Sequence, residues 1–136
     1  AEATIERICH ALLTGTAHGG RGARPVRGGL APTVSRRVTE RMRARLDETP
    51  SLDELAALAD LSPFHFQRMF RTSHGLSPHA WLEAVRLETA KRLMCSGLGL
   101  AEVAAACGFC HQSHLGRVFR RETGLTPAEW RRRACG

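Results

Sequence analysis

Apolar residues recur at intervals of three and four along most of this chain, which is the period of an amphipathic helix. From Thr33 onward no segment alternates apolar and polar residues as a half-buried strand would. The pattern therefore predicts an all-α protein. The first helix is expected to be capped by Thr33 and to end by Pro50, and its inward side is lined by Val34, Val38, Met42 and Leu46.

A helix-turn-helix is predicted in residues 51–75. Ser51 begins the first, short helix with the spacing of a capping box, in which Ser and Glu side chains satisfy free backbone N–H groups. Ser62 followed by Pro63 begins the second helix, because proline at the first helical position gives up a donor that has no partner there. Gly75 then provides a left-handed C-cap. In DNA-binding proteins this arrangement places the second helix in the major groove.

The same unit occurs twice in the chain. The residues RMFRTSHGLSPHAWL at 68–82 return as RVFRRETGLTPAEWR at 117–131, an offset of 49. The short helix before them repeats at an offset of 48, so the second turn holds one extra residue. A repeat of this period indicates one supersecondary unit used twice. We therefore predict a second helix-turn-helix over 100–124, a last helix over 127–133, and a long helix over 78–96 that joins the two units.

The second helix of each unit has an apolar face and a polar face. The residues expected to be buried are Phe66, Met69, Phe70, Leu115, Val118 and Phe119. The residues expected to face outward and bind DNA are Phe64, Gln67, Arg68 and Arg71 in the first unit and Gln112, Ser113, His114, Arg117 and Arg121 in the second. The outward side of the second helix also carries Arg120.

Glutamine and arginine in the major groove can read base edges, since glutamine pairs with adenine N6 and N7 and arginine with guanine O6 and N7. Gln67 and Arg68 are therefore candidates for base contacts, and Arg71, further along, for a phosphate contact. An ordinary solvated helix face explains one such helix equally well, but the repeat favours DNA binding. Gly116 replaces Gln67 in the second unit, so we expect this unit to specify fewer bases and the backbone to be closely approached there.

The predicted helix over 78–96 sets the distance between the two units. About 19 helical residues span about 28 Å, against roughly 34 Å between successive major-groove faces of B-DNA. One chain can then occupy two adjacent grooves on one side of a duplex, provided that the DNA bends or the two reading helices splay.

The charge agrees with a phosphate-binding partner. The chain has 20 basic and 13 acidic side chains, a net charge of +7 and a pI near 10.4, although a merely soluble domain can have the same balance. The run Arg131–Arg133 is more readily a solvated tail than a contact. No signal-peptide order and no long apolar run occurs, which favours a cytoplasmic protein. Five cysteines are an odd number in a chain of ordinary composition, so we expect reduced thiols.

The first 32 residues differ from the rest. Residues 1–14 carry one apolar stripe of an amphipathic helix, which needs something to cover it. Residues 15–32 are rich in glycine and proline, as flexible linkers are. We interpret the helix as the end of another domain, and the chain as a fragment of a longer protein whose main domain is 33–136.

The segments LSPFHFQRMFRTSHGLSPHAWL and GFCHQSHLGRVFRRETGLTPAEW resemble the C-terminal DNA-binding domain of AraC/XylS-type bacterial transcription regulators. The resemblance covers residues 34–133, and the order Gly-Phe, Gln-Ser-His, Arg-x-Phe and Gly-x-x-Pro in the second segment is its most specific part. It implies about seven helices. The base contacts that it implies come from Phe64, Gln67, Arg68, Gln112, Ser113, His114 and Arg117.

The resemblance also implies how the protein works. Members of the family control transcription from promoter DNA, so we expect a regulator. Our first interpretation is an activator that acts with RNA polymerase, and a repressor is the alternative. Residues 1–14 would end an N-terminal dimerisation domain or a domain that binds a small-molecule effector. Asp60 stands where the family usually has the turn glycine, and aspartate tolerates left-handed geometry. Cys110 stands where the family is often acidic or small.

Two other interpretations need weighing. Cys107, Cys110 and His111 spell C-x-x-C-H, the pattern of covalent haem attachment, and His114 extends it towards a zinc pattern. Cys107 aligns with Ala59 in the repeat, however, which makes it a small buried residue, and haem attachment needs export. An enzyme, such as a repair methyltransferase fused to this kind of domain, would need a nucleophile and base or a phosphate loop, which the sequence lacks. We expect no enzyme activity, cofactor or metal.

Overall fold

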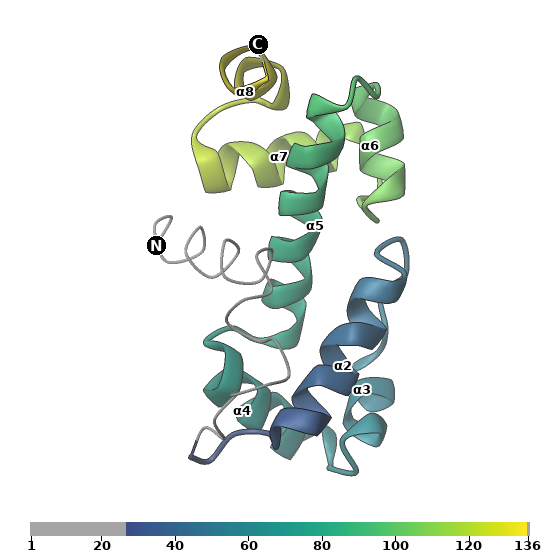
Figure 1. Cartoon of the computed structure of the whole chain (residues 1–136), viewed down its shortest axis with the longest axis vertical. Coiled ribbons are helices and arrows are strands. Elements are labelled where there is room, and N and C mark those ends of the chain that lie inside the picture. Colours follow the sequence, from purple (N-terminus) through teal and green to yellow (C-terminus); the bar gives the residue numbers. More distant parts are fainter. Residues whose placement is uncertain (1–26, 136) are drawn as a thin grey trace.

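The computed structural model describes residues 27–135, which form seven helices and no strand (Figure 1). The helices are α2 (Pro32–Ala44), α3 (Leu52–Leu58), α4 (Pro63–His74), α5 (Pro78–Cys95), α6 (Leu100–Ala106), α7 (Gln112–Thr123) and α8 (Pro127–Ala134). The prediction of an all-α fold is confirmed. Within the described range, none of the helices combines the length and apolarity that a bilayer span requires. The predicted helix over 1–14 and most of the predicted linker over 15–32 lie outside it.

The long helix α5 runs through the middle of the molecule, with one group of helices around each of its ends (Figure 1). The first core lies between α5 and helices α2, α3 and α4, and the second between α5 and helices α6, α7 and α8. The buried side chains that α5 gives to these cores are Trp81, Leu82 and Val85 in the first and Leu87, Ala90 and Met94 in the second. Its N-terminal half therefore belongs to one unit and its C-terminal half to the other.

The helix boundaries repeat together with the sequence. Gly75 after α4 and Gly124 after α7 both adopt the left-handed conformation, with φ of 78° and 79°. The side chains of Ser77 and Thr126 cap α5 and α8, and each cap is followed by proline at the start of the helix. Ser62 caps α4, as predicted. The repeat therefore includes the stop and start signals as well as the apolar pattern.

The turns of the two helix-turn-helix units have the same backbone geometry. The N–H groups of Leu61 and Phe109 each donate to the carbonyl five residues earlier, at 3.0 and 2.9 Å. Just before them, Asp60 and Gly108 take the left-handed conformation, with φ of 56° and 84°. Aspartate therefore fills the role of the turn glycine in the first unit. The extra residue of the second turn is Cys110, which directly follows Phe109.

Helix α2 and the first core include residues that the sequence analysis had placed before the domain. Helix α2 starts at Pro32, and its N-cap residue Ala31 makes no side-chain capping bond, so the prediction of Thr33 as the cap is wrong. Proline suits the first helical position because its missing N–H has no partner there. Leu30, which the sequence placed in the linker, is 3% exposed, and its N–H donates to Ser73 Oγ at 2.8 Å. The end of the linker thus belongs to the first core.

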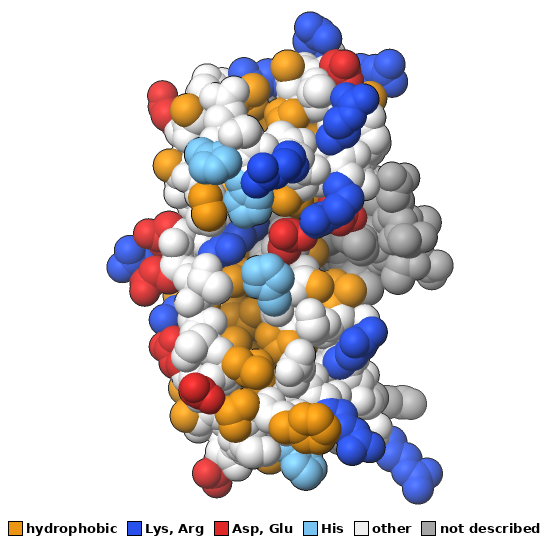
Figure 2. Space-filling model, turned by 180° about the vertical axis from the view of Figure 1, so that it is seen from behind, with side chains coloured by type: hydrophobic (Ala, Val, Ile, Leu, Met, Phe, Trp, Pro, Cys, Tyr) orange, Lys and Arg blue, Asp and Glu red, His pale blue; other side chains and the backbone are white. Residues whose placement is uncertain are grey.

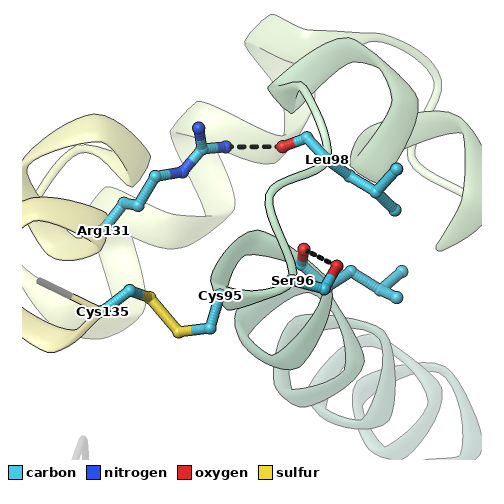
Figure 3. Close-up of a disulfide and its surroundings, with 6 residues drawn as sticks. Cys95, Ser96, Leu98, Arg131 and Cys135 are labelled. Carbon is cyan, nitrogen blue, oxygen red and sulfur yellow. Dashed lines mark hydrogen bonds between the residues drawn. A yellow bond between two sulfur atoms is a disulfide. The ribbon is translucent and has the colours of Figure 1, made fainter.

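A disulfide joins the ends of α5 and α8 (Figure 3). Cys95 and Cys135 are 40 residues apart in sequence, but their Cα atoms lie 5.2 Å apart. The expectation of reduced thiols is therefore wrong for this pair. Sequence spacing gave no sign of it, because α6, α7 and α8 must fold back on α5 before the two residues meet. Cys107, which is buried, and Cys110, which is exposed, have free thiols.

Arg131 anchors α8 beside this disulfide (Figure 3). Its Nη2 donates to the carbonyl of Leu98 at 3.0 Å, and the residue is half-buried. The interpretation of Arg131–Arg133 as a solvated tail is thus wrong for its first member, since helix α8 turns that side chain towards the loop between α5 and α6. The other two arginines of the run are exposed.

We predict that Cys135→Ser lowers the free energy of unfolding by about 2–4 kcal/mol, because the lost cross-link frees a long loop in the unfolded chain. Urea titration followed by circular dichroism measures the change. The control is Cys110→Ser, which removes an exposed free thiol and should leave the midpoint unchanged. Equal stability of Cys135→Ser and the unsubstituted protein, both under oxidising conditions, would contradict the prediction.

Candidate nucleic-acid interface

Helix α4 presents the four residues predicted for the first unit on its outer face. Phe64 is 74% exposed, more than any other large hydrophobic side chain in the described range. Gln67, Arg68 and Arg71 are also exposed, and their side chains make no hydrogen bond or ion pair with another described residue. The opposite face of α4 packs two fully buried phenylalanines into the first core. The helix is therefore anchored on one side and offers unpaired donors on the other.

Helix α7 repeats this arrangement with a different N-terminus. Gln112 and Arg117 are exposed, and among the described residues their side chains have no partner. His111 caps the helix, because its Nδ1 accepts the N–H of His114 at 3.1 Å, and the Ser113 hydroxyl lies 2.8 Å from the same nitrogen. The histidine replaces the serine that caps α4. Of the residues predicted here, Gln112 and Arg117 are the freest to bind a ligand.

His114 is held by the turn in front of α7. Its Nδ1 accepts the N–H of Cys110 at 3.2 Å, and its ring meets the Phe109 ring edge-on with centroids 5.4 Å apart. Burial lowers the pKa of His114, and the charge of Arg117 adds to this effect. The imidazole is therefore neutral at pH 7, and a ligand can reach only the part of the ring that the turn leaves exposed.

The structure separates two neighbouring arginines that share the outer side of α7. Arg121 pairs with Glu83 on α5, and its Nε also lies 3.0 Å from Glu122 Oε1. Arg120 is exposed and pairs with no described residue. The repeat offset of 49 aligns Arg120 with Arg71, and Arg121 with a threonine of α4. The sequence-based set included Arg121 and omitted Arg120, although the repeat offset, applied strictly, would have selected Arg120.

Gly116 leaves one position of α7 without a side chain. A Cβ atom there would meet no atom within 4 Å, so no part of the described protein approaches it. The close approach that the sequence suggested is therefore not made by the protein itself. The position lies one residue before Arg117, on a half-exposed part of the helix, and the bare backbone is open to a ligand.

The two helices lie on the same side of α5, near its opposite ends (Figure 1). α5 has 18 residues, which corresponds to about 27 Å at 1.5 Å per residue. Viewed from behind, Lys and Arg side chains follow the edge of the molecule that carries α4 and α7 (Figure 2). The two polar faces thus form one elongated basic surface.

Two arginines on the opposite edge are paired with carboxylates. Arg41 pairs with Glu54 at 3.1 Å, and Arg45 pairs with Asp47 at 3.0 Å and with Glu48 at 3.2 Å. Figure 2 shows most of the acidic side chains along this edge. The side of α4 and α7 carries Arg68, Arg71, Arg117 and Arg120 without a partner among the described residues, and these charges attract a polyanion.

The cysteine and histidine pattern does not form a metal site within residues 27–135, where no three His, Cys, Asp or Glu side chains are grouped to hold an ion. Cys107 is fully buried in the second core. Burial raises the pKa of its thiol to about 11, so it does not supply the thiolate that binds metals. The predicted position of Cys107 in the core is confirmed.

Comparisons with known proteins agree with this geometry. A helix-turn-helix domain model matches residues 55–133. A probable AraC family transcriptional regulator from Rhodopseudomonas palustris superposes with a TM-score of 0.65 at 30% identity, over 76% of this chain and 99% of that one. The chain belongs to the AraC/XylS family of transcription regulators.

Two further members of the family are informative. The DNA-binding domain of AdpA, solved in complex with a target DNA, superposes with a TM-score of 0.66 at 34% identity, over 74% of this chain and 95% of that one. The transcriptional activator RhaR of Escherichia coli is 32% identical over 75% of this chain and 38% of its own length. Curated relatives share only 28% to 39% of their length with this AraC-type chain.

We predict that the protein loses stability as the pH falls below the ordinary histidine pKa of 6.5, in part through His114. Its pKa is lower in the folded than in the unfolded state, so the unfolded state takes up the proton first and is favoured in this window. Urea midpoints at about pH 7.5 and about pH 5.5 measure the loss. His114→Asn, which can accept the same amide hydrogen bond without titrating, should show a smaller drop; an equal drop would exclude His114 as a source.

Proposed function

We propose that the chain binds double-stranded DNA at a specific sequence by placing α4 and α7 in adjacent major grooves on one side of the duplex. The observation that carries the proposal is that two equivalent helices lie on the same side of α5 and present arginines at the same repeat position. Neither Arg68 nor Arg117 has a side-chain partner among the described residues. The AdpA domain of similar fold, solved on its target DNA, supports it.

Each outward residue has a role that its chemistry suits. Arg68 and Arg117 are assigned to guanine and Gln67 to adenine, and the exposed ring of Phe64 suits a thymine methyl group. Gln112, at the start of α7, also suits a base edge. Because these donors have no partner within residues 27–135, no bond to that part of the chain has to break when DNA binds.

Other residues suit positioning on the backbone. Arg71 and Arg120 hold the same repeat position further along each helix, where they suit phosphate contacts. Ser113 and His114 already bond within the turn, so their contacts with DNA use the groups that remain. Arg121 is committed to Glu83, and we assign it to holding α7 against α5.

The length of α5 has a consequence for the DNA. About 27 Å of helix is shorter than the roughly 34 Å between successive major-groove faces. Either the DNA bends towards the protein or the two reading helices splay. If the DNA bends, sequences that bend easily between the two contacts bind more tightly.

The proposal extends to the whole protein. We propose that it activates transcription, which is the role that the name of RhaR states for that relative. We propose further that it acts together with RNA polymerase and in the cytoplasm. The relatives are longer than the region that they share with this chain, which leaves room for a further domain. We propose a dimerisation or effector-binding domain ahead of α2. In the DNA-binding role proposed for residues 33–136, no enzymatic step and no cofactor is needed.

Selection of bound duplexes from random DNA tests the proposal and supplies the target site. On that site we predict that Arg68→Ala and Arg117→Ala each cost roughly 1–3 kcal/mol and relax the preference at one position. Fluorescence anisotropy with matched and mismatched duplexes measures both effects. Equal losses on the selected site and on random DNA would show that these arginines do not read bases.

The two neighbouring arginines of α7 give a matched comparison. We predict that Arg120→Ala weakens binding to all sequences and lowers the slope of log affinity against log salt by about 1, as one lost phosphate contact should. Arg121→Ala removes the same charge from the next position but leaves the slope nearly unchanged, since Arg121 is paired with Glu83. Binding measured between about 50 and 200 mM salt distinguishes them. Equal slopes for the two variants would contradict the assignment.

A further inference from the structure

The two apolar cores meet α5 in succession, and a buried charge lies where one gives way to the other. Val85 belongs to the first core and Leu87 to the second. Arg86 lies between them and is 6% exposed. Among the described residues, it is the one polar or charged residue that is buried. A buried charge is costly unless its donors are satisfied, so the contacts of this side chain decide what it does.

Arg86 ties α5 to the segment between α2 and α3, at residues 45–51. Its Nε donates to the carbonyl of Leu46 at 2.9 Å, and its Nη2 donates to the carbonyl of Glu48 at 2.9 Å and to Thr49 Oγ1 at 3.0 Å. All three acceptors are neutral, and within the described range the guanidinium forms no ion pair. Burial lowers the pKa of Arg86, but arginine remains charged. The fork of donors fits this loop geometrically, so the bond set is directional.

The turn of the second unit lies against the same place. A Cβ atom on Gly108 would lie 2.0 Å from the Leu46 carbonyl oxygen and 2.8 Å from Arg86 Nε. The equivalent turn residue of the first unit, Asp60, is exposed and carries a full side chain. A side chain at position 108 would therefore clash, which is not the case at position 60. The loop of the first unit, the turn of the second unit and the guanidinium of Arg86 meet at Gly108.

We propose that Arg86 is a positioning residue that fixes how α4 and α7 are oriented relative to each other, and thereby couples the binding of two DNA half-sites. The inference rests on the proposed DNA-binding function. The two units have separate cores and share α5. Their relative orientation therefore depends on how much α5 bends and on any other contact between the units. The contact of Arg86 with the loop, beside Gly108, is such a joint. Binding by two linked modules gains affinity only when the linkage holds both at the right distance and angle.

The test compares two duplexes. One carries the full selected site, and in the other the half contacted by α7, identified through Arg117→Ala, is replaced by unrelated sequence. For the unsubstituted protein we expect the second half-site to raise affinity by roughly 100-fold or more. Arg86→Met keeps an unbranched side chain and removes the hydrogen-bond donors. For this variant we expect the gain from the second half-site to fall by at least about tenfold. Its affinity for the single half-site should stay within about twofold of the unsubstituted protein's.

A spacing series reports on positioning directly. Inserting one base pair between the half-sites should cost the unsubstituted protein most of its gain, whereas Arg86→Met should tolerate the insertion better because its units are no longer held at one angle. A merely destabilised protein would lose affinity for every duplex alike and would show no change in spacing preference. Circular dichroism at the binding temperature establishes that each variant is folded.

Two further variants keep the test decisive. Arg92→Met makes the same substitution on an exposed part of α5, and it should keep the full gain from two half-sites. Thr49→Val removes one acceptor at an exposed position without touching the guanidinium, and we expect a loss of roughly threefold in the coupling. If Arg86→Met does not fold, this variant decides: an unchanged coupling in Thr49→Val would then overturn the inference.

The outcomes separate the two levels of the proposal. No preference for any duplex in the selection would refute the DNA-binding function itself. A gain from two half-sites that survives intact in folded Arg86→Met, with the spacing preference unchanged, would refute the positioning role and leave the function standing. A gain that falls while single half-site affinity persists would support both.

Discussion

The structure depends on one helix that buries apolar side chains in two cores at once. α5 gives Trp81 to the first core and Met94 to the second, and both side chains are almost completely shielded from solvent. Neither helix-turn-helix unit could cover its own apolar faces without its half of α5. Burial of these faces supplies the stability, since each large apolar side chain contributes about 1.5–3 kcal/mol when buried. It also forces the two reading helices to belong to one framework.

Arginines that pair with carboxylates and arginines that face outward without a partner lie on different parts of the domain. On the edge formed by α2 and α3, Arg41 and Arg45 are neutralised by nearby carboxylates. On the outer faces of α4 and α7, Arg68 and Arg117 have no partner among the described residues. An exposed ion pair contributes little to stability, so the pairing matters mainly for where net positive charge remains. A polyanion therefore meets unpaired positive charge on the side of the two reading helices.

The two copies of the module differ where the fold makes different demands on them. The first turn holds Asp60 in left-handed geometry and faces solvent, whereas Gly108 lies against a carbonyl of the other unit and has room for no side chain. The first reading helix is capped by serine and the second by histidine, which follows the extra residue Cys110. The repeat provides two DNA-facing helices. The glycine in the second turn lets the two units contact each other.

The sequence by itself determined the all-α fold, the doubled module, the caps of α3 and α4, the stop at Gly75, and which faces of α4 and α7 are polar, because all of these follow from local backbone preferences and short-range periodicity. It did not reveal the Cys95–Cys135 disulfide, the burial of Leu30, the hydrogen bonds of Arg86 or the pairing that sets Arg121 apart from Arg120. Each of these joins residues far apart in the chain, and such contacts exist only once the helices have packed. Local patterns record which side of a helix is apolar, but the partner that covers it is chosen by the tertiary structure.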